Sequence, residues 1–160
     1  MDEPGRLRRG VAWRRVGVVV LVVVAADQLS KALVTEWIGR GETRNVFLGI
    51  DFVNQRNHGV AFGLFPHGGT VVVVATLFAL GVLLAYFVTH AHAPLLWLPT
   101  GLLLGGAGGN LLDRVRGDGV IDFINVPLWP AFNLADAAIT FGVIALLLVI
   151  ETSARQRARA

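Results

Sequence analysis

Hydrophobic and polar positions divide the chain into long apolar segments separated by polar ones. No Asp, Glu, Lys or Arg occurs between Arg56 and Asp113, and this length allows two membrane crossings of about 20 residues each. Inside it, Pro94 and the polar residues of "THAHAPLLWLP" predict a turn. We therefore expect transmembrane helices over 69–89 and 94–112.

The same pattern predicts one further helix on each side of this pair. The first covers 16–38 and opens with eleven uncharged residues, and the last covers 135–151 and crosses a bilayer only if neighbouring residues extend it. Backbone groups in lipid must pair within the segment, which favours a helix despite the many valines. The basic stretch "RLRRGVAWRR" also resembles the start of a secretory signal peptide, but no A-x-A-like cleavage site follows it.

The composition agrees with this pattern. With 54% hydrophobic and 16% charged residues in 160 positions, the chain carries more apolar surface than a water-soluble domain can bury. The prediction is an all-α integral membrane protein, with four transmembrane helices and a small strand-containing extracytoplasmic segment, in a single membrane-embedded domain over 1–160. The absence of cysteine excludes a disulfide framework and a cysteine nucleophile.

Arginines indicate the orientation of the helices. They cluster before the first helix and after the last, which predicts that both termini are cytoplasmic. The segments 39–68 and 113–134 would then face outward. The net charge of +3 is interpreted as this topology signal, and nothing else in the chain indicates binding to nucleic acid.

Polar side chains gather at the outer ends of the predicted helices. Asp27 and Lys31 lie past the middle of the first helix, and their spacing of four residues places them on one face as a possible ion pair. The third helix ends in "GGAGGNLLDR", and the fourth begins with "FNLAD". Because charges in a membrane are costly and usually face a bundle interior, a shared site is a simpler explanation than several unrelated exceptions.

Several of these features also have a purely structural explanation. An ion pair lowers the cost of both charges without any chemistry. Gly101, Gly105 and Gly109 recur every four residues, which favours close helix packing over a phosphate-binding loop. Asp118 in "RGDG" is typical of a turn. A histidine metal site is disfavoured because this topology separates the histidines across the membrane: His58, His67, His90 and His92.

Two acids in a largely apolar run, Asp122 and Asp136, suggest catalysis. "VIDFI" alternates like a short strand, and Pro127 and Pro130 allow the chain to reverse within the 14-residue separation. Two carboxylates that share a proton can hydrolyse a peptide, because one activates water while the other polarises the carbonyl. Spacing alone admits Asp113 equally well as the partner of Asp136, and an ion-coupled transporter would also need such acids.

Five ordered motifs make the chain similar to a known family. They are "DQLSK" (27–31), "NHGVAFG" (57–63), "GGAGGNLLDR" (105–114), "VIDFI" (120–124) and "FNLAD" (132–136). This set resembles the lipoprotein signal peptidases, also called signal peptidase II. The resemblance implies a four-helix bacterial membrane aspartic peptidase that cleaves prolipoproteins immediately before a diacylglyceryl-modified cysteine.

The resemblance also implies roles for individual residues. Asp122 and Asp136 would form the catalytic dyad. The family's other polar positions, interpreted as substrate-positioning or structural groups, correspond to Asp27, Lys31, Asn57, Asn110, Asp113, Arg114 and Asn133. The expected partners are diacylglyceryl-modified prolipoproteins and membrane lipid, with no nucleic acid, no metal and no cofactor.

The implied location is the bacterial cell membrane, with the active site toward the extracytoplasmic face. The segment 40–66 shows apolar alternation in "NVFLGIDFVNQ", which predicts a small strand-rich platform there. Three tryptophans near predicted segment ends suit either interfacial anchoring or plain packing: Trp37, Trp97 and Trp129.

Two other functions compete with the peptidase. An ion-coupled transporter would place polar groups along the whole membrane depth, whereas the third predicted helix is apolar up to its outer end. A non-enzymatic membrane scaffold would account for the glycine face but would leave the costly aspartates without a role.

Overall fold

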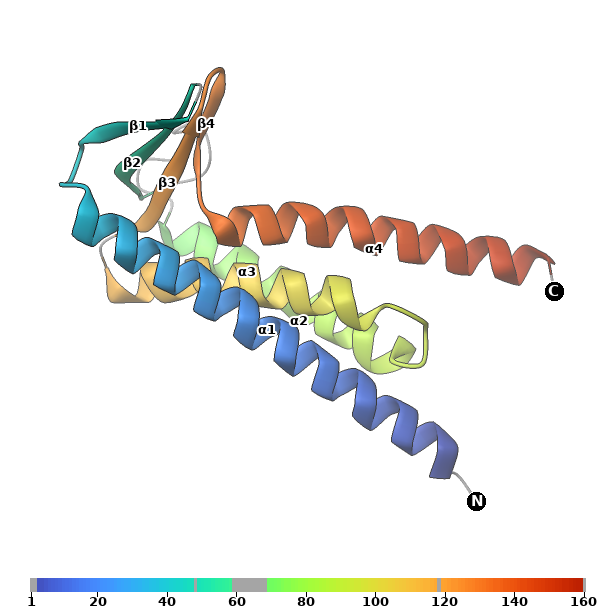
Figure 1. Ribbon diagram of the computed structural model, residues 1–160. Helices are drawn as coiled ribbons and strands as arrows, with labels where there is room; N and C mark the ends of the chain where they lie inside the picture. Colours follow the sequence, from blue (N-terminus) through green and yellow to red (C-terminus); the bar gives the residue numbers. More distant parts are fainter. Residues whose placement is uncertain (1–2, 48, 59–68, 118, 160) are drawn as a thin grey trace.

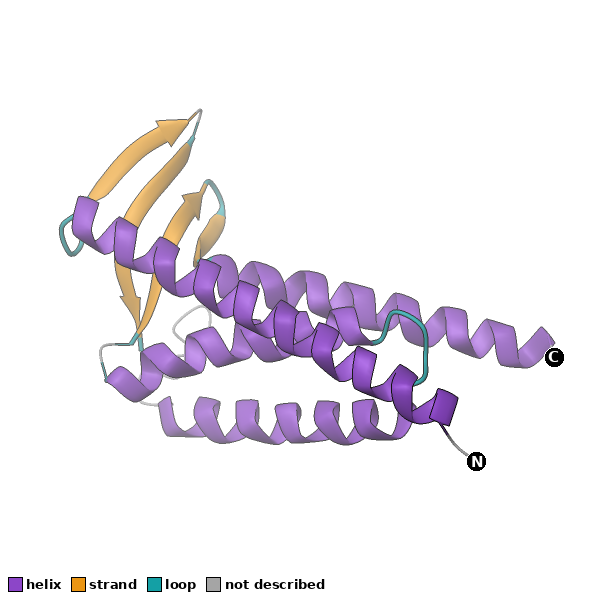
Figure 2. Cartoon of the chain, turned by 60° about the horizontal axis from the view of Figure 1, so that its bottom comes forward, coloured by secondary structure: helices purple, strands orange, loops and turns teal. Residues whose placement is uncertain are grey.

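Four helices pack side by side and carry an antiparallel sheet at one end (Figures 1 and 2). The computed structural model describes residues 3–47, 49–58, 69–117 and 119–159. Both chain termini lie at the end of the bundle away from the sheet (Figure 1). The helices are α1 (Glu3–Trp37), α2 (Gly69–His90), α3 (Trp97–Arg116) and α4 (Leu134–Arg159).

Three of these helices have the length and composition of membrane spans. They are α1 over Arg9–Trp37, α2 over Thr70–His90 and α4 over Leu134–Gln156. The prediction of four such helices is therefore met in three cases. A helix does lie at the predicted third position, but glycines, Asn110 and a charged C-terminal turn reduce its hydropathy.

The composition of α3 follows from its central position. It packs against the other three helices, so its surface meets protein more than lipid. A Cβ added to Gly101 would lie 2.6 Å from the Cβ of Val19, and one added to Gly105 would lie 2.8 Å from the Cβ of Val23. The glycine face predicted to allow close packing is thus confirmed, and it faces α1.

The helix ends differ from the sequence prediction most at α1 and α4, and α3 also lies a few residues further along the chain than the predicted 94–112. α1 begins at Glu3 instead of near residue 16, because the arginine-rich stretch continues the same helix. α4 continues to Arg159, well beyond 151, and this extension supplies the length that the apolar run lacked. At the C-terminal end of α3, Gly117 adopts a left-handed conformation with φ of 89° and stops the helix.

The sheet unites the two segments that connect the helices. Its strands are β1 (Thr43–Phe47), β2 (Ile50–Asn57), β3 (Val120–Val126) and β4 (Trp129–Phe132), paired in that order. The strands expected within 40–66 and at "VIDFI" are confirmed, whereas β4 and the pairing of β2 with β3 were not predicted. Residues 59–66 of the expected platform, and with them His67 and Asp118, lie outside the described residues.

Apolar side chains attach the sheet to the end of α1. Val34 and Ile38 pack against Phe123 of β3 in one buried cluster. The ring of Phe52 in β2 meets the rings of both Phe123 and Trp37 edge-on, with centroids 6.0 and 6.5 Å apart. This packing holds β3, which carries Asp122, at a set height above the helices.

Candidate active site

Asp136 is positioned by the first turn of α4. Asn133 precedes the helix, and its side-chain oxygen accepts a hydrogen bond of 2.9 Å from the backbone N–H of Asp136. In return, the backbone N–H of Asn133 donates to Asp136 Oδ2 at 3.2 Å. This reciprocal arrangement is a capping box with Asn and Asp as its members. It fixes the carboxylate at the end of the helix that favours negative charge.

Asp122 lies in β3 and is 4% exposed. Its Oδ2 accepts a hydrogen bond of 3.0 Å from Asn57 Nδ2, and its Oδ1 accepts one of 2.8 Å from Asn133 Nδ2. Asn57 stands at the end of β2, opposite Val120 of β3. The pairing of the two strands therefore places the amide donor beside the acid.

Two amide side chains connect the carboxylates of Asp122 and Asp136. Asn110 Nδ2 donates to Asp136 Oδ1 at 2.8 Å, and Asn133 Nδ2 donates both to Asp122 and, at 3.2 Å, to Asn110 Oδ1. Asn133 thus bonds Asp122 with its side chain and Asp136 with its backbone. The two acids come from different elements and share one hydrogen-bond network.

The environment of Asp122 favours its protonated form. Burial raises the pKa of this carboxyl from 3.8 to about 6, and the negative charge of Asp136 acts in the same direction. Hydrogen bonds from Asn57 and Asn133 and the charge of Lys31 lower the pKa, but burial outweighs them. A carboxyl with such a pKa can hold or release a proton close to neutral pH.

A buried cluster of charged side chains is hydrogen-bonded to this network. Lys31 is 1% exposed, and its Nζ lies 2.7 Å from an oxygen of Asp27 and 2.7 Å from one of Asp113. The predicted pair of Asp27 with Lys31 is therefore present, and Asp113 joins it. Lys31 Nζ also donates to Asn110 Oδ1 at 3.1 Å, which ties the cluster to the amide that bonds Asp136.

Both acids of this cluster also bind backbone near the site. Asp27 Oδ1 accepts a hydrogen bond of 3.0 Å from the N–H of Ala135, in the first turn of α4. Asp113 Oδ2 accepts one of 3.3 Å from the N–H of Ile121, next to Asp122. The ion cluster therefore positions the two elements that carry Asp122 and Asp136.

Gln28 belongs to this arrangement and was missed in the sequence. Its Nε2 donates to Asp113 Oδ1 at 2.9 Å and to the carbonyl oxygen of Gly109 at 3.3 Å, and its Oε1 accepts a hydrogen bond from Arg116. Helix periodicity groups residues three and four apart and so did not group it with its neighbour Asp27, although Gln28 Nε2 also donates to Asp27 Oδ2 at 3.2 Å. An amide inside an otherwise apolar segment was the available signal.

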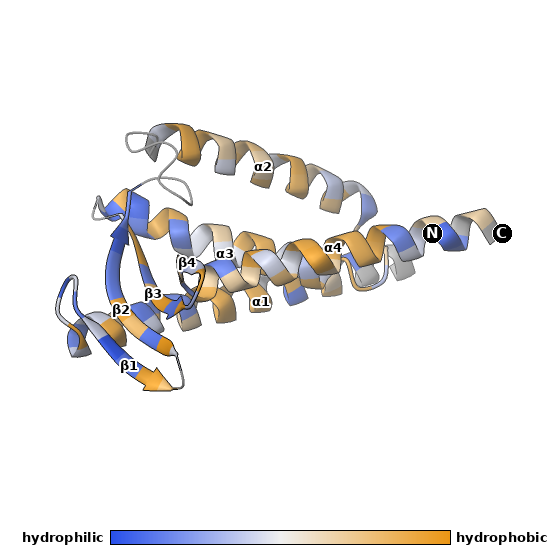
Figure 3. Ribbon diagram, turned by 90° about the horizontal axis from the view of Figure 1, so that it is seen from above, coloured by the Kyte–Doolittle hydropathy of each residue, from blue (hydrophilic) through white to orange (hydrophobic). Residues whose placement is uncertain are grey.

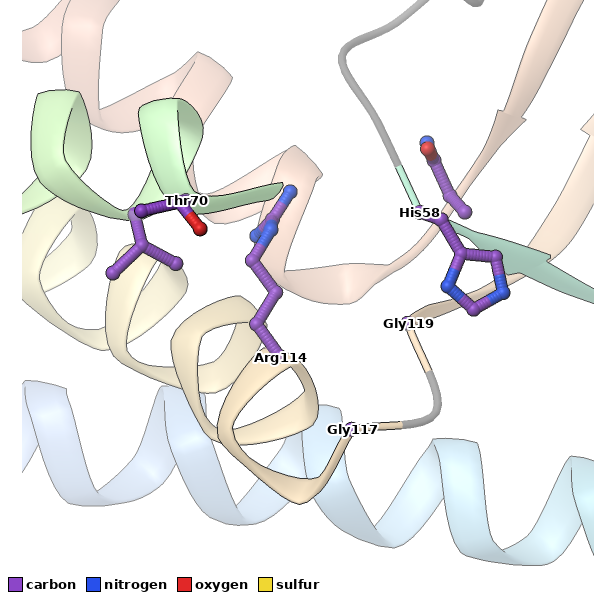
Figure 4. A pocket seen from close by; sticks show the side chains of 7 residues that line it. His58, Thr70, Arg114, Gly117 and Gly119 are labelled. Atoms are coloured by element: carbon purple, nitrogen blue, oxygen red, sulfur yellow. The ribbon is translucent and has the colours of Figure 1, made fainter. Parts of the chain in front are cut away.

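Arg114 lies half-buried at the edge of the network. Its guanidinium donates to the carbonyl oxygen of Asn110 at 3.3 Å, and its positive charge acts on Asp122 and Asp136. It also lines a cavity of about 330 Å³ together with Asn57, His58 and Thr70 (Figure 4). The cavity opens beside the amide that bonds Asp122, which gives a ligand a place next to that acid.

All nine residues selected from the sequence lie in this one region: Asp27, Lys31, Asn57, Asn110, Asp113, Arg114, Asp122, Asn133 and Asp136. Among the described residues, no group of three or more His, Cys, Asp or Glu side chains is arranged to hold a metal ion. His90 stacks on Tyr86 at the end of α2, with ring centroids 4.3 Å apart.

Comparison with known proteins identifies the family. The family model described as signal peptidase II matches residues 19–152. The chain belongs to the signal peptidase II family. It is 44% identical over 132 residues to the lipoprotein signal peptidase of Moorella thermoacetica, covering 80% of this chain and 87% of that protein. It is 35% identical over 134 residues to that of Halothermothrix orenii, covering 83% and 92%.

Solved structures of other proteins share this fold. Two structures of bacterial membrane enzymes determined by the in meso method share 28% sequence identity with the chain. One superposes with a TM-score of 0.76 and covers 84% of this chain and 91% of that one. The other has a TM-score of 0.79 and covers 87% and 88%. The resemblance seen in the five motifs is therefore confirmed as membership of the signal peptidase II family.

Proposed function

We propose that this chain is a membrane aspartic endopeptidase that removes signal peptides from bacterial prolipoproteins, cutting immediately before a diacylglyceryl-modified cysteine. The observation that carries the proposal is the connection of Asp122 and Asp136 through Asn133, beside an open cavity. Membership of the signal peptidase II family supplies the substrate class.

The environments of the two acids support different roles. Asp122 has the raised pKa, so it holds the proton and polarises the scissile carbonyl. Asp136 accepts N–H hydrogen bonds from Asn110 and Asn133, which stabilise a carboxylate, and it acts as the base toward water.

Hydrolysis then proceeds with each proton accounted for. Asp136 takes one proton from water as the water oxygen bonds to the carbonyl carbon, and Asp122 gives its proton to the carbonyl oxygen. When the tetrahedral intermediate collapses, Asp122 recovers its proton from the hydroxyl, and Asp136 delivers its proton to the amine nitrogen as the C–N bond breaks. Both acids return to their starting states.

The remaining residues have supporting roles in this proposal. Arg114 and Asn57 line the cavity and position substrate carbonyl groups. Asn110 and Asn133 orient the two acids. The cluster of Asp27, Lys31 and Asp113 holds β3 and α4 together beneath them.

The proposed placement in the bacterial cell membrane has α3 as a fourth span, enclosed by the other three. Both termini face the cytoplasm, where the terminal arginines favour them. The sheet lies at the opposite end of the bundle from the termini (Figure 1), so in this placement it is on the extracytoplasmic side. A lipid-modified cysteine anchored in the outer leaflet would then meet Asp122 and Asp136 at the membrane surface.

Three matched Asp→Asn variants test the proposal. Asp122→Asn and Asp136→Asn should each abolish cleavage of a lipidated precursor by the purified, membrane-reconstituted protein. Asp113→Asn removes a buried acid that bonds Lys31, so it should lower activity much less. Circular dichroism and thermal unfolding of each variant check that the fold is intact.

Two further measurements separate the proposal from its competitors. The wild-type protein should leave an unlipidated precursor uncut, and it should show no ion flux in sealed vesicles. Near-normal turnover by Asp122→Asn or Asp136→Asn, in a folded variant, would remove that residue from the catalytic pair. Ion flux that depends on these acids would favour a transporter instead.

A further inference from the structure

Large apolar side chains are exposed where the two hairpins of the sheet turn. Phe47 and Ile50 end β1 and begin β2, and Leu128 and Trp129 lie at the turn from β3 into β4. Phe47 is 64% exposed, Trp129 is 63% exposed and Leu128 is fully exposed. We call these four residues the hairpin patch. Burial of these side chains against another apolar surface would remove their unfavourable contact with water.

Strand pairing brings the four residues to the same end of the sheet, where both hairpins turn. Phe47 is paired with Ile50 across the first turn, and Val126 with Trp129 across the second. Asp51 and Asn125, which follow Ile50 and precede Val126, are partners between the hairpins. Gly49 and Pro127 are also close, because a Cβ added to Gly49 would lie 3.5 Å from Pro127 Cγ. The hairpin patch is thus one continuous feature.

The second turn holds Leu128 in a strained backbone conformation. Leu128 has a φ of 64°, a left-handed conformation that is unfavourable for a residue with a branched side chain. Glycine or asparagine would adopt it at lower cost. This conformation costs free energy, and a fully exposed leucine buries no apolar surface within the chain in return, which points to a contact outside the chain.

The surroundings of the hairpin patch indicate the kind of contact. The strands cross the direction of the helices, and the hairpin ends project beyond the bundle on the side of α4 (Figure 1). Figure 3 shows strongly hydrophobic colouring at the end of β1. On α4, Phe141 and Leu147 are exposed apolar residues of the kind that face lipid. In the membrane placement proposed above, a patch at the sheet end of that helix lies at the depth of the membrane–water boundary, where tryptophan is enriched.

We propose that the hairpin patch inserts into the outer leaflet of the membrane and holds the sheet on the bilayer surface. The insertion fixes the position of β3, which carries Asp122, and of β4, which leads directly to the cap of α4. The partner is the lipid boundary itself, through apolar side chains and not through headgroup recognition. The inference rests on the membrane placement proposed above and not on the peptidase chemistry.

Single-cysteine labelling tests the insertion, since the chain has no cysteine of its own. Phe47→Cys and Leu128→Cys place a polarity-sensitive fluorophore in the hairpin patch. Thr43→Cys, an exposed position at the other end of β1, is the matched control. Leu147→Cys, exposed on α4, reports whether the helices themselves are in the bilayer. The full-length protein is reconstituted in vesicles of phosphatidylcholine and phosphatidylglycerol.

The expected result is a blue-shifted emission at positions 47 and 128, quenching by lipids that carry a nitroxide near the headgroup, and protection from aqueous iodide. Position 43 should be quenched by iodide alone. If position 147 is quenched by lipid while 47 and 128 behave like 43, the insertion is wrong and the membrane placement stands. Protection of 47 and 128 from iodide without quenching by lipid would also overturn the proposal, because a second protein copy would then cover the patch.

Discussion

Raising the pH through 6 should progressively inactivate the proposed peptidase, because Asp122 would lose the proton that polarises the scissile carbonyl. Its pKa is raised from 3.8 to about 6, mainly by burial. A difference of about 2 units corresponds to roughly 3 kcal/mol in favour of the protonated form. The protonated fraction is then about a tenth at pH 7 and about a hundredth at pH 8. In the free enzyme, kcat/KM should therefore fall about tenfold per pH unit above 6.

A variant of Asn57 moves this pH dependence in a direction that the structure specifies. The hydrogen bond from Asn57 stabilises the ionised form of Asp122 and lowers its pKa. Asn57→Ala should shift the midpoint of the alkaline decline to higher pH, even if the maximum rate also drops. Asn45→Ala removes an amide from the same sheet that bonds Asp51 instead, and it should leave the midpoint unchanged.

The measurement is the initial rate of cleavage of a lipidated precursor at low substrate concentration across the pH range in which the protein stays folded. A lesion that is merely structural would lower the whole profile without moving its midpoint. An unchanged midpoint in Asn57→Ala, or activity that increases through pH 6, would refute the role of Asp122 as the proton holder.

Two predictions concern stability and are measured by thermal unfolding in detergent, followed by tryptophan fluorescence. Lys31→Met leaves two buried carboxylates without their shared cation, and it should destabilise the protein by about 3–5 kcal/mol; an unchanged unfolding temperature would show that the cluster is not structural. Gly105→Leu forces atoms into the space of Val23 and should cost about 1–3 kcal/mol. Gly81→Leu, at a position with no atom within 4 Å of the added Cβ, should have little effect, and equal effects of the two substitutions would contradict the close packing of α3.

Features that depend on near neighbours in the chain were predictable. Apolar runs long enough to cross a bilayer indicated the helices, and four-residue spacing indicated both the Asp27–Lys31 pair and the glycine face of α3. Composition could not show that α3 packs against all three other helices, because the residues of one helix do not specify which helices lie beside it. The glycines and Asn110 that α3 uses in these contacts also make it less apolar than the membrane spans of the other three helices.

Contacts between distant parts of the chain were decided by the tertiary structure. Asn57 and Asp122 are 65 residues apart, and only the pairing of β2 with β3 brings them together. Spacing left Asp113 and Asp122 equally possible as partners of Asp136. In the fold, Asp113 bonds Lys31, while Asp122 shares Asn133 with Asp136.

The sequence by itself determined where the helices lie, the membrane class and most of the polar residues of the site, because hydrophobicity and helix periodicity are local properties. Only the tertiary structure decided how those residues pair. It also placed the apolar turns of the two hairpins side by side at one end of the sheet. The reason is that register between strands and contacts between helices depend on packing many residues at once, and no spacing along one chain specifies which distant amide bonds which acid.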